Sequence, residues 1–139
     1  MRNLRSVCFA VFLVPSVLMG PIAHACLGPS LESSIFFDEQ ELKAGIDGPA
    51  IAKVTITALT SEFVGIARVD KVIKGEIDRD TIVVTVLATY CTRGFGIGAS
   101  GIVVGSLKRN AQGELVLTAI EETNSQRRAR MKAHSTQGR

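Results

Sequence analysis

The sequence has no tryptophan, one tyrosine and only two histidines among its 139 residues. His24 and His134 lie near the two ends, so residues 26–122 contain no histidine at all. That region cannot assemble a Ser-His-Asp triad or a Cys-His pair. It is also short of the ligands that zinc sites use. We therefore expect no catalytic residue, no metal site, no cofactor and a protein that is not an enzyme.

Acidic residues are the remaining candidates for chemistry, because a pair of carboxylates can serve a glycosidase. They cluster at three places: Asp38/Glu39/Glu41, Asp78/Asp80 and Glu121/Glu122. Each cluster lies in a polar or turn-like stretch, which favours a solvated surface position over an active site.

The string Gly96-x-Gly98-x-x-Gly101 matches the dinucleotide-binding fingerprint in its letters. The fingerprint works only where a helix follows it and meets the pyrophosphate. Here the strand-like residues Ile102-Val103-Val104 follow instead. We interpret residues 94–101 as a loop whose glycines permit positive φ.

The first 25 residues have the pattern of a secretory signal peptide. Arg2 and Arg5 precede an apolar run over residues 7–19, and Ala23-His24-Ala25 forms an Ala-x-Ala cleavage signature. The run is shorter than a membrane-spanning helix requires. We therefore expect residues 1–25 to be removed and the mature protein to be secreted or periplasmic.

Charge divides the mature chain into two parts. Residues 26–126 contain 9 Lys/Arg and 13 Asp/Glu, whereas residues 127–139 contain five cations and no acid. The domain is thus mildly acidic, and a nucleic-acid footprint is not expected. We expect residues 123–139 to be a disordered basic tail, which could contact an anionic membrane surface.

Cleavage after Ala25 leaves two cysteines, Cys26 and Cys91. An oxidising compartment then permits a single intramolecular disulfide. Two unpaired thiols or a bridge to another chain are the alternatives. A cysteine directly after the cleavage signature is also typical of bacterial lipoproteins, in which Cys26 would be acylated.

Alternating apolar and polar residues predict five β-strands with no helical pattern between them. The runs cover residues 50–58, 63–74, 81–88, 101–107 and 114–120, with a turn at residues 110–113. β-branched residues on both faces of the third run suggest a strand covered on both sides. Residues 29–45 fit either a short helix or a brief strand around Ile35-Phe36-Phe37. The fold class is all-β, an antiparallel five-stranded barrel or sandwich over residues 26–122.

Several short motifs resemble the netrin-like/tissue-inhibitor-of-metalloproteinase module. They are Cys26 followed by Pro29, Val72-Ile73-Lys74-Gly75, the strand at residues 81–88, Cys91, and Ile102-Val103-Val104-Gly105. The resemblance implies a secreted, five-stranded, OB-like barrel with a Cys26–Cys91 disulfide. Gly28 stands where the inhibitors carry a second cysteine, so the resemblance implies the fold rather than their inhibitory activity.

These expectations together describe an exported, non-enzymatic binding module whose partner is another exported or envelope protein. The candidate contact residues are Cys26, Leu27, Tyr90, Arg93 and Phe95. The alternative is an envelope-anchored structural protein or a lipoprotein acylated at Cys26. Few aromatic residues are available to stack on bases, so nucleic acid is not expected as a partner.

Overall fold

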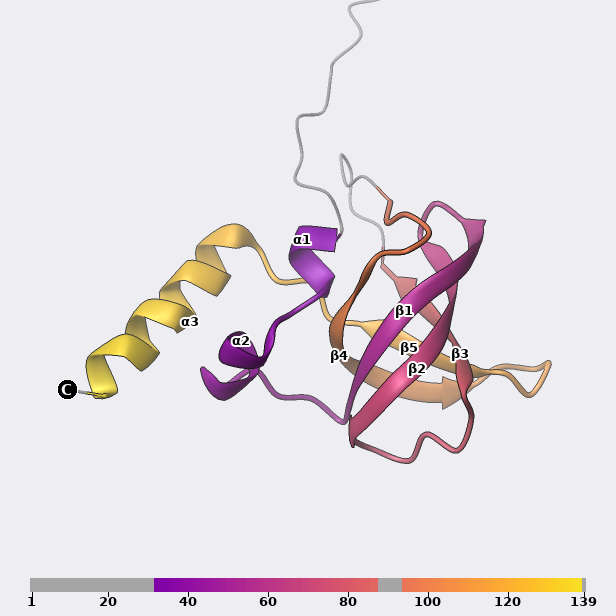
Figure 1. The fold of residues 1–139 in the computed structure, drawn as a ribbon, viewed down its shortest axis with the longest axis horizontal. Helices are drawn as coiled ribbons and strands as arrows, with labels where there is room; N and C mark the ends of the chain where they lie inside the picture. The colour runs from indigo at the N-terminus through magenta and orange to yellow at the C-terminus, as the bar shows by residue number, and fades with distance from the viewer. Residues whose placement is uncertain (1–31, 88–93, 139) are drawn as a thin grey trace, which may run out of the picture.

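A computed structural model describes residues 32–87 and 94–138, and its centre is a closed barrel of five strands (Figure 1). The strands are β1 (Ala50–Ser61), β2 (Val64–Lys74), β3 (Thr81–Val86), β4 (Ser100–Arg109) and β5 (Leu115–Ala119). Each lies within or beside a run of alternating residues, so the prediction of a five-stranded barrel is confirmed.

The barrel is mixed rather than antiparallel, and this part of the prediction is wrong. Its strand order is β1-β2-β3-β5-β4, with β4 pairing β1 to close the ring. Four of the pairings are antiparallel, but β3 and β5 run in the same direction, from Val83 opposite Val116 to Val86 opposite Ala119. Period-two alternation reports which face a residue occupies and carries no information on strand direction.

The barrel interior is filled by aliphatic side chains from all five strands. The largest fully buried ones are Ile56, Ile82, Leu117, Val54, Val84 and Val103, and β2 contributes the smaller Ala67. β3 is fully buried on one face only, since Val83 and Thr85 are half-exposed. Its outward β-branched residues suit a pleated surface without a covering layer, which corrects the expectation that both faces are covered.

The segment before β1 combines the two structures that its sequence allowed. Helix α1 (Glu32–Ile35) leads to a single β-bridge between Phe37 and Ile102, and helix α2 (Glu39–Lys43) follows. Phe37 is buried with Ile51, Ile102 and Val104 in a small second core outside the barrel. Because Leu42 packs against this core, α2 covers the outer surface of β1 and β4.

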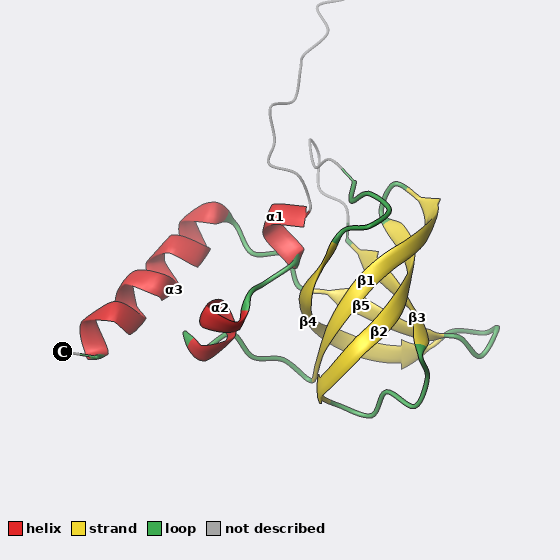
Figure 2. Cartoon of the chain, viewed as in Figure 1, coloured by secondary structure: helices red, strands yellow, loops and turns green. Residues whose placement is uncertain are grey.

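Helix α3 (Asn124–Gln137) occupies the region expected as a disordered tail. It begins with a capping box, in which the Thr123 hydroxyl accepts from the Gln126 backbone and the Gln126 side chain accepts from the Thr123 backbone. Its later turns extend away from the barrel (Figure 2), and none of its residues is buried. Within the described ranges, no helix is long and apolar enough to cross a membrane.

Candidate functional site

One end of the barrel, here called the loop end, is formed by the β1–β2 turn, the end of β3 and residues 94–99. Backbone hydrogen bonds join these segments. The Val86 N–H donates to the Phe63 carbonyl at 3.2 Å. The Gly98 N–H donates to the Ile56 carbonyl at 2.8 Å, and the Ile56 N–H donates to Ala99 at 2.8 Å. The loop before β4 is therefore fixed along β1.

Two glycines give this loop its path. Gly98 has a φ of 90°, a conformation that glycine adopts without steric cost. A Cβ on Gly94 would lie 2.3 Å from the Glu62 carbonyl oxygen, so only glycine permits this close approach. β4 follows the loop, as the sequence predicted, and no helix N-terminus is available there for a dinucleotide.

Of the predicted contact residues, only Phe95 lies in the described part of the chain. Cys26, Leu27, Tyr90 and Arg93 lie outside it. Phe95 is 3% exposed, which corrects the prediction that its ring belongs to a contact surface. The ring packs edge-on against Phe36, with centroids 6.3 Å apart, because Gly65 leaves room beside it.

The exposed apolar side chains at the loop end are Leu87 and Ile97, which are 78% and 69% exposed. They are the most exposed large hydrophobic residues in the described ranges. One follows β3 and the other precedes β4, so they lie on either side of the segment that contains Tyr90, Cys91 and Arg93. Neither residue was among the predicted contact residues. The alternation of apolar and polar residues does not distinguish an exposed aliphatic residue at a strand end from a core residue.

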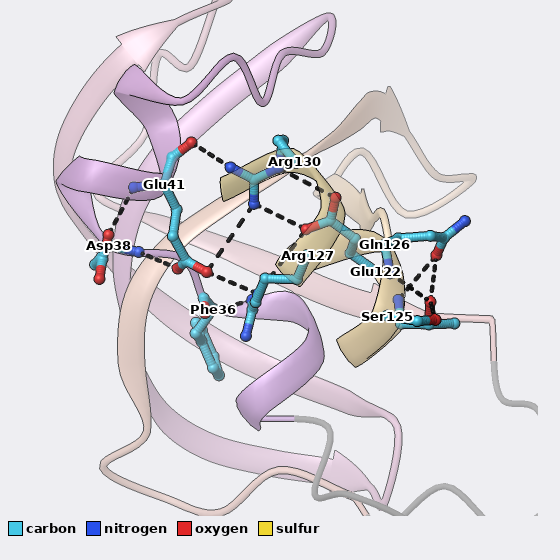
Figure 3. A network of polar contacts seen from close by, with 9 residues as sticks. Phe36, Asp38, Glu41, Glu122, Ser125, Gln126, Arg127 and Arg130 are labelled. Atoms are coloured by element: carbon cyan, nitrogen blue, oxygen red, sulfur yellow. Dashed lines mark hydrogen bonds and ion pairs between the residues drawn. The ribbon is translucent and has the colours of Figure 1, made fainter. Parts of the chain in front are cut away.

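A second candidate site is a network of ion pairs, here called the arginine clamp, that joins α3 to the segment around α2 (Figure 3). Arg127 Nε lies 2.8 Å from Glu41 Oε1. Arg130 makes two hydrogen bonds to Glu122, from Nε to Oε1 at 3.2 Å and from Nη2 to Oε2 at 2.8 Å. The four side chains are between 12% and 17% exposed. The solvated acidic clusters expected from the sequence are thus corrected at Glu41 and Glu122.

The two arginines also bind backbone carbonyls of the N-terminal segment. Arg127 donates to the Phe36 carbonyl at 3.2 Å, and Arg130 donates to the Glu41 carbonyl at 2.6 Å. Both guanidinium groups lie over the Phe37 ring, 4.7 Å and 5.9 Å from its centroid. These contacts are charge-assisted hydrogen bonds and cation–π contacts, which are stronger away from water.

The clamp also affects protonation. The pKa of Arg130 is raised, first by its hydrogen bonds to Glu122 and then by the negative charge of Glu122 and Glu41, while partial burial opposes the shift. Arginine is protonated at every ordinary pH, so the contacts with Glu122 and Glu41 reinforce a charge that Arg130 already carries.

Three acidic residues outside the clamp pair with cations, namely Asp47, Asp70 and Asp78. Asp78 forms a two-atom salt bridge with Arg109 at the edge of an open hollow of ≈ 540 Å³ at the opposite barrel end. The pKa of Asp47 is lowered, chiefly by a hydrogen bond from Lys74. The described residues contain no group of three or more His, Cys, Asp or Glu that could hold a metal ion.

Comparison of the whole chain with protein-family models, curated proteins and solved structures finds no match in any of the three.

Proposed function

We propose that the protein is an exported, non-enzymatic interaction module that binds another exported or envelope protein at the loop end of its barrel. The observation that carries the proposal is the exposure of Leu87 and Ile97 on either side of residues 88–93. Loops on a rigid barrel are common binding elements. When a partner covers aliphatic side chains that are exposed to this extent, apolar surface leaves the water, and this favours binding.

The barrel topology supports an OB-like fold for this module. Its order β1-β2-β3-β5-β4 closes five strands into one ring, and the chain returns between β3 and β4 rather than continuing as a simple meander. OB folds are five-stranded Greek-key barrels that bind ligands with their surface loops. Together with the motifs quoted above, this supports the proposed likeness to netrin-like modules.

The proposal includes a disulfide between Cys26 and Cys91. Support comes from Phe36 and Phe95, which pack against each other and lie shortly after the two cysteines in the sequence. A chain of ten residues can span up to about 35 Å, so Cys26 is well within reach of the segment before Phe95. Acylation of Cys26 in an envelope-anchored lipoprotein is the alternative, and it would prevent this bridge.

A protein is a better partner for this module than a nucleic acid. Phe36, Phe37 and Phe95 are buried and Phe63 is half-buried, so no fully exposed ring is available in the described residues for stacking on bases.

The proposal is tested by placing a photo-crosslinking amino acid at Leu87 or Ile97 in the full chain and identifying the captured protein from the periplasm or medium. The affinity of that partner is then measured with purified variants. Leu87→Ser/Ile97→Ser should weaken binding by at least about tenfold, because two buried aliphatic side chains each contribute about 1–3 kcal/mol.

The matched control is Val72→Ser/Ile73→Ser, which removes two aliphatic side chains of 41% and 39% exposure near the other end of the barrel. This variant should bind within about twofold of the unchanged protein. Equal weakening by both double variants would contradict a contact at the loop end.

A further inference from the structure

We infer that helix α3 is a charge-dependent latch whose docked state masks two of the four cations that would otherwise bind an anionic lipid surface. The inference does not depend on the protein partner proposed above. It rests on how the cations of α3 are divided between the barrel and solvent.

The cations of α3 lie in two pairs with different surroundings. Arg127 and Arg130, three residues apart, point into the arginine clamp and are 17% and 15% exposed. Arg128 and Lys132, four residues apart and so on one face of the helix, are exposed. In the docked helix, therefore, only two of these four cations are exposed to solvent.

Docking rests on the ion pairs and hydrogen bonds of the arginine clamp and on the contacts of its two guanidinium groups with the Phe37 ring. No residue of α3 is buried, and its one large apolar side chain, Met131, is only half-buried. Isolated helices of this length are only marginally stable in water, so α3 depends on the clamp to stay ordered. Weakening the clamp would release the helix without opening the barrel core.

The latch also holds the N-terminal segment. The Phe36 and Glu41 carbonyls accept hydrogen bonds from Arg127 and Arg130, and the Ser34 carbonyl accepts one from the Glu122 N–H at 3.1 Å. Release of α3 would therefore loosen the residues on both sides of Phe37. The segment that leads to Cys26 and the C-terminal helix are coupled by these contacts.

An anionic lipid surface is the partner that fits the released helix. Residues 124–137 contain no acid, so no internal charge opposes an approach to anionic head groups. Each cation near such a surface strengthens the attraction. The helix lacks an apolar face for insertion, so the attraction is electrostatic and falls with salt. Glu41 and Glu122 compete with the lipid for the same two guanidinium groups.

The first test compares two double variants that remove the same number of charges. Glu41→Gln/Glu122→Gln neutralises the clamp and keeps the α2 capping box, since glutamine can replace glutamate there. Glu39→Gln/Glu121→Gln removes neighbouring charges that make no ion pair in the clamp. Hydrogen exchange of α3 should be at least about tenfold faster in the clamp variant only, while β1–β5 keep their protection.

The second test measures binding of both variants to vesicles of phosphatidylglycerol and phosphatidylcholine at low salt. The clamp variant should bind about thirtyfold more tightly than the control, the fold-change that corresponds to about 2 kcal/mol for two freed cations. Adding Arg127→Gln/Arg130→Gln to the clamp variant should abolish this gain. The substitution keeps helix propensity nearly constant, since arginine and glutamine have similar values.

Three results would overturn the inference. One is equal hydrogen exchange of α3 in the two double variants. Another is equal vesicle binding by both. The third is tighter binding of the clamp variant to a single-stranded oligonucleotide but not to vesicles, which would assign the released cations to nucleic acid.

Discussion

At the scale of single residues, the chemistry of a side chain predicts only in part whether that side chain is buried. Phe95 is an aromatic residue in a glycine-rich loop, a pattern that indicates an exposed contact residue. The structure buries it because Gly65, on the neighbouring strand β2, leaves space for its ring. Arg127 and Arg130 are charged residues in a basic run, a pattern that predicts exposure to solvent. The arginine clamp leaves both side chains mostly buried. In each case a residue distant in sequence decides the outcome.

At this scale we predict the titration of Asp70. Its pKa is lowered, first by a hydrogen bond from the Thr55 hydroxyl at 2.6 Å and then by Arg68. A carboxyl whose pKa is lower in the folded state stabilises the fold above its ordinary pKa, and this contribution is lost as pH falls through the folded value. NMR titration should show the Asp70 pKa rising toward its ordinary value in Thr55→Val, which keeps the side-chain shape.

The Arg68 salt bridge with Asp70 stays in place in that variant, so a residual shift should remain. An unchanged Asp70 pKa in Thr55→Val would show that the hydroxyl is not its main hydrogen-bond donor. Thr57→Val is a suitable control, because its hydroxyl donates to the Ile66 carbonyl and not to Asp70.

At the scale of elements, the strands were predictable and helix α3 was not. β1 and β2 alternate apolar and polar residues over most of their length, so their existence follows from the sequence. The direction of β5 does not follow from the sequence, because the closure of the ring sets which strands β5 pairs with. α3 lacks apolar periodicity since it docks through arginines. The one local sign of its start is Thr123-x-x-Gln126, which fits a capping box.

We predict that this cap is needed for the first turn of α3. Thr123→Ala should lower the stability of the helix by about 1 kcal/mol, because the Gln126 N–H loses its side-chain acceptor. The local opening free energy from hydrogen exchange measures this directly. Thr136→Ala, near the other end of the same helix, should have a smaller effect. Equal effects of the two changes would show that the capping box does not determine helix stability.

At the scale of the whole molecule, a small barrel is extended by the N-terminal segment and α3, which contact each other through the arginine clamp. The N-terminal segment reaches β4 through Phe37, and α3 holds that segment from outside. The barrel was predictable from its strands. The arginine clamp was not, because it joins Glu41 to Arg127, which lie far apart in the sequence. Such long-range ionic contacts leave no local pattern in a sequence. The proposed Cys26–Cys91 bridge would fasten the same N-terminal segment at its other end.

We predict that the proposed bridge contributes strongly to the stability of the protein. Cys26→Ser/Cys91→Ser should lower the free energy of unfolding by about 4 kcal/mol, the value expected for a loop of this length. Denaturant unfolding followed by circular dichroism measures the loss, and the reduced wild-type protein should match the variant. The intact mass should rise by about two daltons on reduction. A diacylglycerol mass on Cys26 would contradict the bridge and favour the lipoprotein alternative.

The parallel pairing of β3 with β5 has a consequence for biosynthesis. β5 is the last strand to leave the ribosome, and it supplies the neighbour that both β3 and β4 need on one edge. A nascent chain that ends before Leu115 therefore cannot complete the ring. Open strand edges do not form a stable compact domain on their own. The closed five-stranded ring thus cannot form before β5 has been synthesised.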